Sequence, residues 1–99
     1  MNYHSDTMDF EWDPQKAVAN LKKHRVAFEE AASVFGNDLT ITVADPDHSG
    51  REDRFISIGL SSGGRVLMVS HTDRGDRVRV ISARTLTRAE RKAYEEAIK

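Results

Sequence analysis

Five basic side chains lie close together in the C-terminal half of the sequence, where His71, Arg74, Arg77, Arg79 and Arg84 fall within fourteen residues. The planar guanidinium of arginine donates paired hydrogen bonds that match the oxygens of a phosphate. Histidine changes its protonation state near neutral pH, so it can transfer protons. Metal-free cleavage of RNA needs a base for the 2′-hydroxyl, an acid for the leaving oxygen and cations around the phosphate. The cluster therefore points to phosphodiester chemistry.

His71 is the best candidate for proton transfer, and Glu52 or Lys23 can assist if the fold brings them near. Two simpler interpretations stay open, because His71 can be a hydrogen-bonded strand residue and the arginines can be solvated surface charges. A run of acidic residues and one histidine in residues 45–53 matches no spacing of metal ligands. We interpret that run as a polar turn and expect neither a metal nor a cofactor.

Alternation along the last strand predicts that Arg77 and Arg79 share one face, which must be the open face if helices cover the other. Strict alternation places Arg84 on the opposite face. A bulge near the end of this strand can turn the Arg84 side chain to the other face, so the sequence leaves the orientation of Arg84 open.

Composition limits the class of protein. With 99 residues the chain has the length of one domain, and with 38% hydrophobic and 31% charged residues it has enough apolar side chains for a modest core. The absence of cysteine excludes disulfides and thiolate metal sites and fits a reducing, cytoplasmic location. No segment has the pattern of a signal peptide or a membrane span. Residues 1–50 carry four Lys and Arg against nine Asp and Glu, whereas residues 51–99 carry eleven against seven, so the net charge of −1 conceals a basic second half.

Periodicity and capping residues predict the elements that position these side chains. Residues 1–8 are expected to form a flexible lead, followed by a single domain over residues 9–99 that begins with a short edge strand at 10–12. Asp13 and Pro14 predict a helix start, and a second helix follows over residues 27–35. Period-two patterns predict strands at 39–43, 54–60, 65–72 and 77–83, and Thr87 with Glu90 predicts the capping box of a last helix. The order predicts an α+β fold, an antiparallel sheet with its helices packed on one face.

Several of these stretches together resemble the BrnT family of toxins: Phe10–Asp13, Lys22–Ala31, Arg51–Arg54, His71–Gly75 and Arg79–Arg84. The similarity extends from Met8 to Glu96. It implies a RelE-like fold, with two N-terminal helices and a C-terminal helix packed on the sheet. It further implies a ribonuclease toxin of a type II toxin–antitoxin pair that inhibits translation and growth. The implied partner is a BrnA-like antitoxin with a ribbon–helix–helix domain, which represses the operon in complex with the toxin.

The resemblance also assigns residues. It implies functional roles for eight positions, of which the last two are weaker candidates: Glu52, Arg54, His71, Arg74, Arg79, Arg84, Lys23 and His24. Together with the basic cluster, we expect catalysis by five residues, Glu52, Arg54, His71, Arg79 and Arg84. We expect RNA contacts by four more, Lys23, His24, Arg74 and Arg77. Two positions depart from the family pattern, because Arg25 stands where a glycine is usual and Asp73 where a glutamate is usual. A residue other than glycine at Arg25 pays a steric cost if the chain is left-handed there.

Two hypotheses of different classes follow. In the first, the arginines stabilise the transition state of RNA cleavage, and the products are a 2′,3′-cyclic phosphate and a 5′-hydroxyl. In the second, the basic face is a docking surface for an antitoxin or a nucleic acid and cleaves nothing, since arginines suited to phosphate also suit carboxylates. A dimeric antitoxin predicts an assembly of two toxins and two antitoxins, which would bind operator DNA through the antitoxin.

Overall fold

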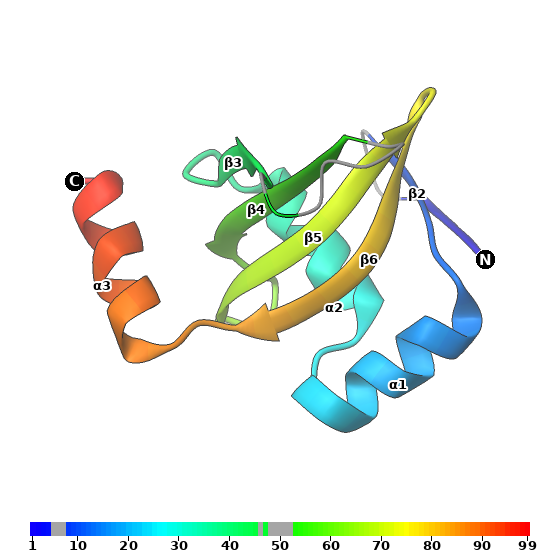
Figure 1. Cartoon of the computed structure of the whole chain (residues 1–99), viewed down its shortest axis with the longest axis horizontal. Helices are drawn as coiled ribbons and strands as arrows, with labels where there is room; N and C mark the ends of the chain where they lie inside the picture. The colour runs from blue at the N-terminus through cyan, green and yellow to red at the C-terminus, as the bar shows by residue number, and fades with distance from the viewer. Residues whose placement is uncertain (5–7, 46, 48–52) are drawn as a thin grey trace.

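The computed structural model describes residues 1–4, 8–45, 47 and 53–99. Three helices and a six-stranded sheet form within these residues (Figure 1). In chain order the elements are β1 (Asn2–His4), β2 (Asp9–Glu11), α1 (Pro14–His24), α2 (Phe28–Ser33), the 3-10 turn η1 (Val34–Gly36), β3 (Ile41–Ala44), β4 (Arg54–Leu60), β5 (Val66–Arg74), β6 (Arg77–Thr85) and α3 (Arg88–Ala97).

The strands lie in the order β1-β2-β6-β5-β4-β3. The predicted α+β class and the meander from β3 to β6 are confirmed, since each of these strands pairs antiparallel with the next. Two predictions about the N-terminal strands are wrong. Strand β2 is not at the edge, because it pairs in parallel with β6 on one side and antiparallel with β1 on the other. Residues 1–8 are not merely a lead, because Asn2–His4 form β1.

Helix α1 starts as predicted, with the Asp13 carboxylate accepting from the backbone N–H of Gln15 at 2.8 Å. The spacing of Ala17, Val18 and Leu21 predicts one apolar face for this helix, but Val18 and Leu21 are 64% and 50% exposed whereas Asn20 is buried. The Asn20 amide donates to the carbonyls of Val26 and Ala83, both at 2.9 Å, and its oxygen accepts from the Ala83 N–H at 3.0 Å. A polar clamp therefore joins α1 to β6.

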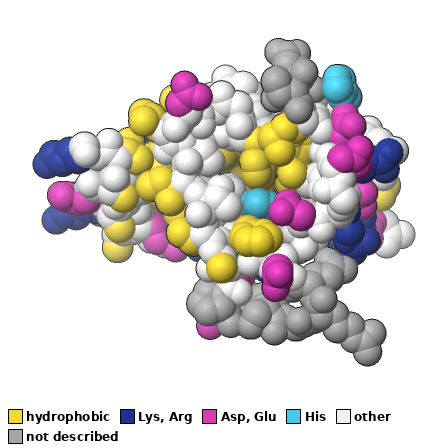
Figure 2. Space-filling model, turned by 90° about the horizontal axis from the view of Figure 1, so that it is seen from above, with side chains coloured by type: hydrophobic (Ala, Val, Ile, Leu, Met, Phe, Trp, Pro, Cys, Tyr) yellow, Lys and Arg dark blue, Asp and Glu magenta, His cyan; other side chains and the backbone are white. Residues whose placement is uncertain are grey.

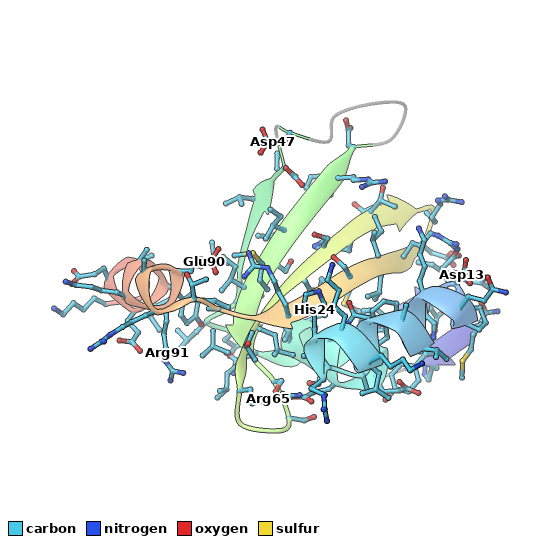
Figure 3. The ribbon with its side chains drawn as sticks, turned by 60° about the horizontal axis from the view of Figure 1, so that its bottom comes forward. Asp13, His24, Asp47, Arg65, Glu90 and Arg91 are labelled. Atoms are coloured by element: carbon cyan, nitrogen blue, oxygen red, sulfur yellow. The ribbon has the colours of Figure 1, made fainter. Side chains whose placement is uncertain are left out.

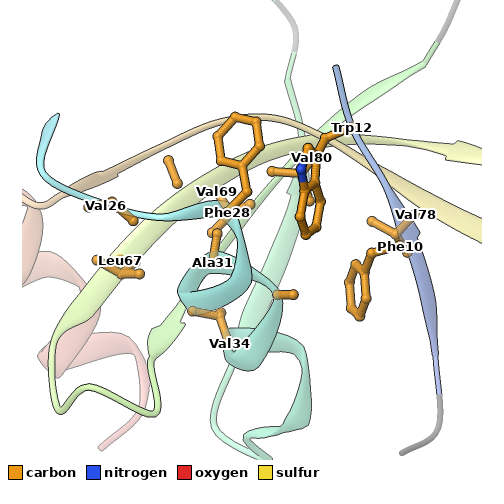
Figure 4. Close-up of a cluster of buried hydrophobic side chains, with 12 residues drawn as sticks. Phe10, Trp12, Val26, Phe28, Ala31, Val34, Leu67, Val69, Val78 and Val80 are labelled. Atoms are coloured by element: carbon orange, nitrogen blue, oxygen red, sulfur yellow. The ribbon is translucent and has the colours of Figure 1, made fainter. Parts of the chain in front are cut away.

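The hydrophobic core lies between the sheet and the two N-terminal helices (Figure 4). Aromatic side chains of Trp12 and Phe28 meet edge to face with ring centroids 5.8 Å apart. Apolar residues of β5 and β6 form the sheet side of the core, and all are at most 6% exposed: Leu67, Val69, Val78, Val80 and Ala83. One face of the sheet is thus covered by α1 and α2.

The opposite face of the sheet, here called the open face, carries half-exposed side chains: Arg54, Ile56, Ile58, Met68, Ser70, Arg79, Ser82 and Arg84. A bulge in β6 decides which residues belong to it. Ser82 pairs with Ser70 and Val80 pairs with His71, so Ile81 has no partner of its own. The extra residue reverses the alternation, and Arg84 therefore shares the open face with Arg79.

Helix α3 stands apart from α1 and α2, beyond the end of β6 (Figure 1). Its N-terminus has the predicted capping box, in which the Thr87 hydroxyl accepts from the Glu90 N–H and the Glu90 carboxylate accepts from the Thr87 N–H. Tyr94 is its one buried residue and donates to the Leu39 carbonyl at 3.2 Å. The expectation that all helices cover one face is therefore wrong, because ten residues with a single buried anchor cannot form a packed layer.

Candidate active site

Four side chains form a row across the open face near the turn between β5 and β6, and we call them the transverse row. Glu11 of β2 is in register with Arg79 of β6, Arg79 with Thr72 of β5, and Thr72 with Arg54 of β4. Residues in register on neighbouring strands lie on the same face, about 5 Å apart. Thr72 is buried and its hydroxyl donates to the Asp53 carbonyl at 2.7 Å. The sheet thus aligns one carboxylate and two guanidinium groups.

Glu11 and Arg79 are in direct contact. Nη1 of Arg79 donates to Oε2 of Glu11 at 2.7 Å, and Nη1 of Arg77 lies 3.9 Å from the other oxygen, Oε1. The Glu11 side chain is 18% exposed and that of Arg79 is 30% exposed. Because Phe10 points into the core, alternation along β2 directs Glu11 to the open face. Arg54 forms no ion pair within the part of the chain that the structure describes.

Arg84 lies in a different row, in register with Met68. Met68 is four positions from Thr72 on β5, which corresponds to about 13 Å along the strand. The guanidinium of Arg84 donates to both carboxylate oxygens of Glu90, from Nη1 at 2.8 Å and from Nη2 at 2.9 Å. Hydrogen bonds from Arg84, and then from the Thr87 backbone, lower the pKa of Glu90 to about 2, and the same pair raises the pKa of Arg84. Figure 3 shows Glu90 where the chain leaves β6 for α3.

His71 lies on the helix-covered face and not beside the arginines. It is 4% exposed, in register with buried Val80, and its ring packs edge to face against Phe35 at 4.8 Å. Nε2 is 2.7 Å from Oγ of Ser57, whereas Nδ1 is buried without a partner among the described residues. Burial lowers the pKa of His71, an effect that the charge of Asp73 partly offsets. The pairing of β5 with β6 places His71 opposite Val80, next to Arg79 along β6, but the His71 side chain lies on the helix-covered face and that of Arg79 on the open face.

The remaining predicted residues are scattered. Arg74 and Arg77 are exposed partners at the turn between β5 and β6, on the same face as the transverse row. Lys23 and His24 lie in the last turn of α1, where Figure 3 shows His24, on the side of the sheet that the helices cover and not on the open face. Glu52 lies outside the described residues.

Charge is mixed on this molecule. Figure 2 shows acidic and basic side chains side by side on the face that it presents, without a continuous basic surface. The open face has the same character, because Arg79 and Arg84 are both bonded to carboxylates. An anionic ligand must therefore compete with Glu11 and Glu90 for these guanidinium groups.

Residues 1–4, 8–45, 47 and 53–99 contain neither a candidate metal site nor a candidate membrane span. No three His, Asp or Glu side chains in these ranges gather where they could hold a metal ion. Within the same ranges, no helix has the length and apolar character needed to cross a membrane.

Sequence reasoning did not find Glu11 or Glu90 as partners of the arginines. The alternation of Phe10, Glu11 and Trp12 was a signal for Glu11, since it directs that carboxylate away from the core. Its neighbour could not be inferred, because the parallel pairing of β2 with β6 joins residues that are 68 positions apart.

Comparison with known proteins agrees with this description. The model of a protein family described as the ribonuclease toxin BrnT of type II toxin–antitoxin systems matches residues 12–90. The crystal structure of the Brucella abortus ribonuclease toxin BrnT at 1.1 Å is similar, with a TM-score of 0.59 and 22% sequence identity over 80% of this chain and 96% of that chain. At this identity the likeness concerns the fold. No curated protein sequence matches.

Proposed function

Because this chain belongs to the BrnT family of ribonuclease toxins of type II toxin–antitoxin systems, we propose that it cleaves RNA by attack of a ribose 2′-hydroxyl on the adjacent phosphate. The observation that carries this mechanism is the transverse row, with two arginines and a carboxylate on one face. Guanidinium groups bind phosphate oxygens and stabilise the charge that develops on them in the transition state. The reaction requires no metal ion and leaves a 2′,3′-cyclic phosphate and a 5′-hydroxyl.

Separate roles follow from the two rows of the open face. Arg54 and Arg79 hold the scissile phosphate, since they flank Thr72 in one row. Arg84 binds a second phosphate of the same RNA chain, because it lies about 13 Å from the transverse row along the sheet. Arg74 and Arg77, at the turn between β5 and β6, bind the RNA beyond the transverse row. Lys23 and His24 make RNA contacts farther away, from the end of α1.

Two residues that the sequence predicts to be catalytic, His71 and Glu52, take different roles in this proposal. His71 supports the sheet from behind, because its buried ring is bonded to Ser57 on the helix-covered face. Glu52 stays a candidate for proton transfer, on the strength of the resemblance alone. We likewise propose, from the resemblance, that the fold is RelE-like.

The first experiment is incubation of the purified chain, freed of any antitoxin, with total RNA in excess EDTA, followed by end-group analysis. We expect fragments with cyclic-phosphate and 5′-hydroxyl ends. Arg79→Ala and Arg54→Ala should each lower the rate by about 10²- to 10³-fold, the usual effect of removing one donor to a developing charge. Arg91→Ala is the matched control, because Arg91 is exposed on α3 and pairs only with Glu95 among the described residues.

A type II system implies an antitoxin, and we propose that it is a ribbon–helix–helix protein of the BrnA kind. Such a dimeric partner gives two toxins with two antitoxins, and the complex binds operator DNA through the antitoxin. The toxin would act in the cytoplasm, where RNA cleavage inhibits translation and growth.

A binding module without activity is the second candidate, and a specific observation favours it. Arg79 and Arg84 are each bonded to a carboxylate, so this face is already suited to the acidic side chains of a protein partner. In that case Arg79→Ala weakens the complex with the antitoxin, and the folded chain leaves RNA intact both alone and with translating ribosomes. That pair of results would overturn the ribonuclease proposal.

A further inference from the structure

The proposed cleavage needs a base on the same face as the phosphate-binding arginines, and this face offers few. His71 lies on the other side of the sheet. Glu90 has a pKa of about 2 and is bound through both oxygens to Arg84, so it has little tendency to take up a proton. Asp9 is in register with Arg77 at the outer end of the face and is bonded to the exposed His4. Among the described residues, Glu11 is the carboxylate that lies in the transverse row itself.

The surroundings of Glu11 suit a base that works beside a bound phosphate. Its Oε2 is 2.7 Å from Nη1 of Arg79, and its Oε1 is 3.9 Å from Nη1 of Arg77, beyond hydrogen-bond distance. Oε1 is therefore free of a strong bond to either arginine. A 2′-hydroxyl and the phosphate that it attacks are carried by neighbouring carbons of one ribose. A base one strand away from the phosphate-binding guanidinium is thus at the right scale of distance.

We propose that Glu11 is the general base of the cleavage reaction, an inference that rests on the ribonuclease function proposed above. The carboxylate takes the proton of the 2′-hydroxyl while the 2′ oxygen forms a bond to phosphorus. The bond from phosphorus to the 5′ oxygen breaks, and that oxygen keeps the electron pair and takes a proton from water. Glu11 then returns its proton to solvent. Arg79 has two roles, because it positions Glu11 in the free protein and neutralises the phosphate during attack.

The first test is Glu11→Gln, which preserves the shape of the side chain and an oxygen that can accept from Arg79. A general base contributes about 10²- to 10⁴-fold to a rate. We expect kcat to fall within that range, while affinity for a 2′-deoxy oligonucleotide of the same sequence, which cannot be cleaved, stays within about threefold. Asp9→Asn is the matched control, since it removes a neighbouring carboxylate on the same strand and face and should leave kcat unchanged.

Two measurements distinguish a general base from a residue that only positions others: the dependence of the rate on pH, and the recovery of activity when formate is added. The charged groups beside Glu11 on the open face are Arg77 and Arg79 of β6 and, two residues away on β2, Asp9. The arginines keep their charge on acidification, and the Asp9→Asn control removes the other carboxylate. A loss of rate at low pH that persists in Asp9→Asn and disappears in Glu11→Gln therefore belongs to Glu11. Formate should restore part of the rate of Glu11→Ala, because a small carboxylate can occupy the vacated space.

The outcomes are distinct. If the wild type cleaves RNA and Glu11→Gln cleaves it at the same rate with the same acidic limb, Glu11 is not the base and the ribonuclease function stands. A loss of rate without a change in the acidic limb and without formate rescue would also overturn the proposal, in favour of positioning. If the folded wild type cleaves nothing, the ribonuclease proposal and this inference fail together. Thermal unfolding of each variant shows whether it is folded.

Discussion

Arg79 and Arg84 point to the same side of β6, although the five positions between them would place them on opposite sides of a regular strand. The reason is the bulge at Ile81, which opposes no residue of β5. Without it, alternation would direct Arg84 toward the core beneath α1 and α2, where a guanidinium could not remain hydrated. A single inserted residue therefore places a second arginine, Arg84, on the open face, outside the transverse row.

Release of Arg84 from Glu90 should strengthen RNA binding. Glu90→Gln removes the charge that competes with phosphate, while glutamine can still complete the capping box with Thr87. An exposed ion pair is worth about 0.2–1 kcal/mol, so we expect up to about fivefold tighter binding of a 2′-deoxy oligonucleotide, measured by fluorescence anisotropy at fixed salt. Glu95→Gln makes the same charge change on α3, where Glu95 pairs with Arg91. Equal gains in both variants would mean that Arg84 does not contact phosphate.

Arg25→Gly should stabilise the protein. Arg25 ends α1 with φ 60° and ψ 32°, the left-handed conformation in which any side chain crowds its own carbonyl. Glycine removes this strain and keeps both hydrogen bonds of this residue's backbone: its N–H donates to the Leu21 carbonyl, and its carbonyl accepts from Nη2 of Arg65. We expect a gain of about 1 kcal/mol, or roughly 4–8 °C in Tm. Lys22→Gly, inside the helix, should lower Tm, and a lower Tm for Arg25→Gly would contradict the prediction.

Acid should destabilise the protein through His71. Burial lowers the pKa of His71 in the folded state, so the unfolded chain, with an ordinary value near 6.5, binds the proton more readily. Stability is therefore complete above pH 6.5 and falls as the pH drops below it, by at most about 1.4 kcal/mol per pH unit. Urea unfolding between pH 5 and 7.5 measures this slope. His71→Gln cannot be protonated and can still bond to Ser57, so its slope should be smaller, and an unchanged slope would assign the effect to another group.

Gly59 should not tolerate a methyl group. A Cβ there would lie 2.1 Å from Oγ1 of Thr40, whose hydroxyl is bonded to the Val34 carbonyl at 2.7 Å. Gly59→Ala must displace that hydrogen bond or β4, and overpacking of this kind costs about 1–3 kcal/mol. Gly36→Ala is the control, because nothing lies within 4 Å of its added Cβ, and it should change stability by less than about 0.5 kcal/mol. Equal unfolding free energies for the two variants would show that β4 yields at Gly59.

Local signals in the sequence predicted the local structure well. Asp13 before Pro14 marked the start of α1, and Thr87 with Glu90 marked the capping box of α3. These features involve residues within one turn of each other, so their energetics do not depend on the rest of the fold. The left-handed cost anticipated at Arg25 also proved local, since it arises from the backbone of that residue.

The same reasoning failed where a side chain depends on distant strands. Val18 and Leu21 are apolar and suitably spaced, yet α1 turns Asn20 inward, where its amide bonds to backbone groups of Val26 and Ala83 that an apolar side chain would leave unpaired. His71 lies one residue from Thr72 of the transverse row, but a shift of one position in a strand changes the face.

The sequence by itself therefore determined the element order, the helix caps and the supply of arginines, because each depends on neighbours in the chain. Tertiary structure decided which of these arginines share a face of the sheet. Strand register, the bulge at Ile81 and the parallel pairing of β2 with β6 set the faces of Arg79, Arg84 and Glu11. Those three features are set by contacts between residues that are far apart along the chain, and the free energy of such contacts cannot be assigned from a local pattern.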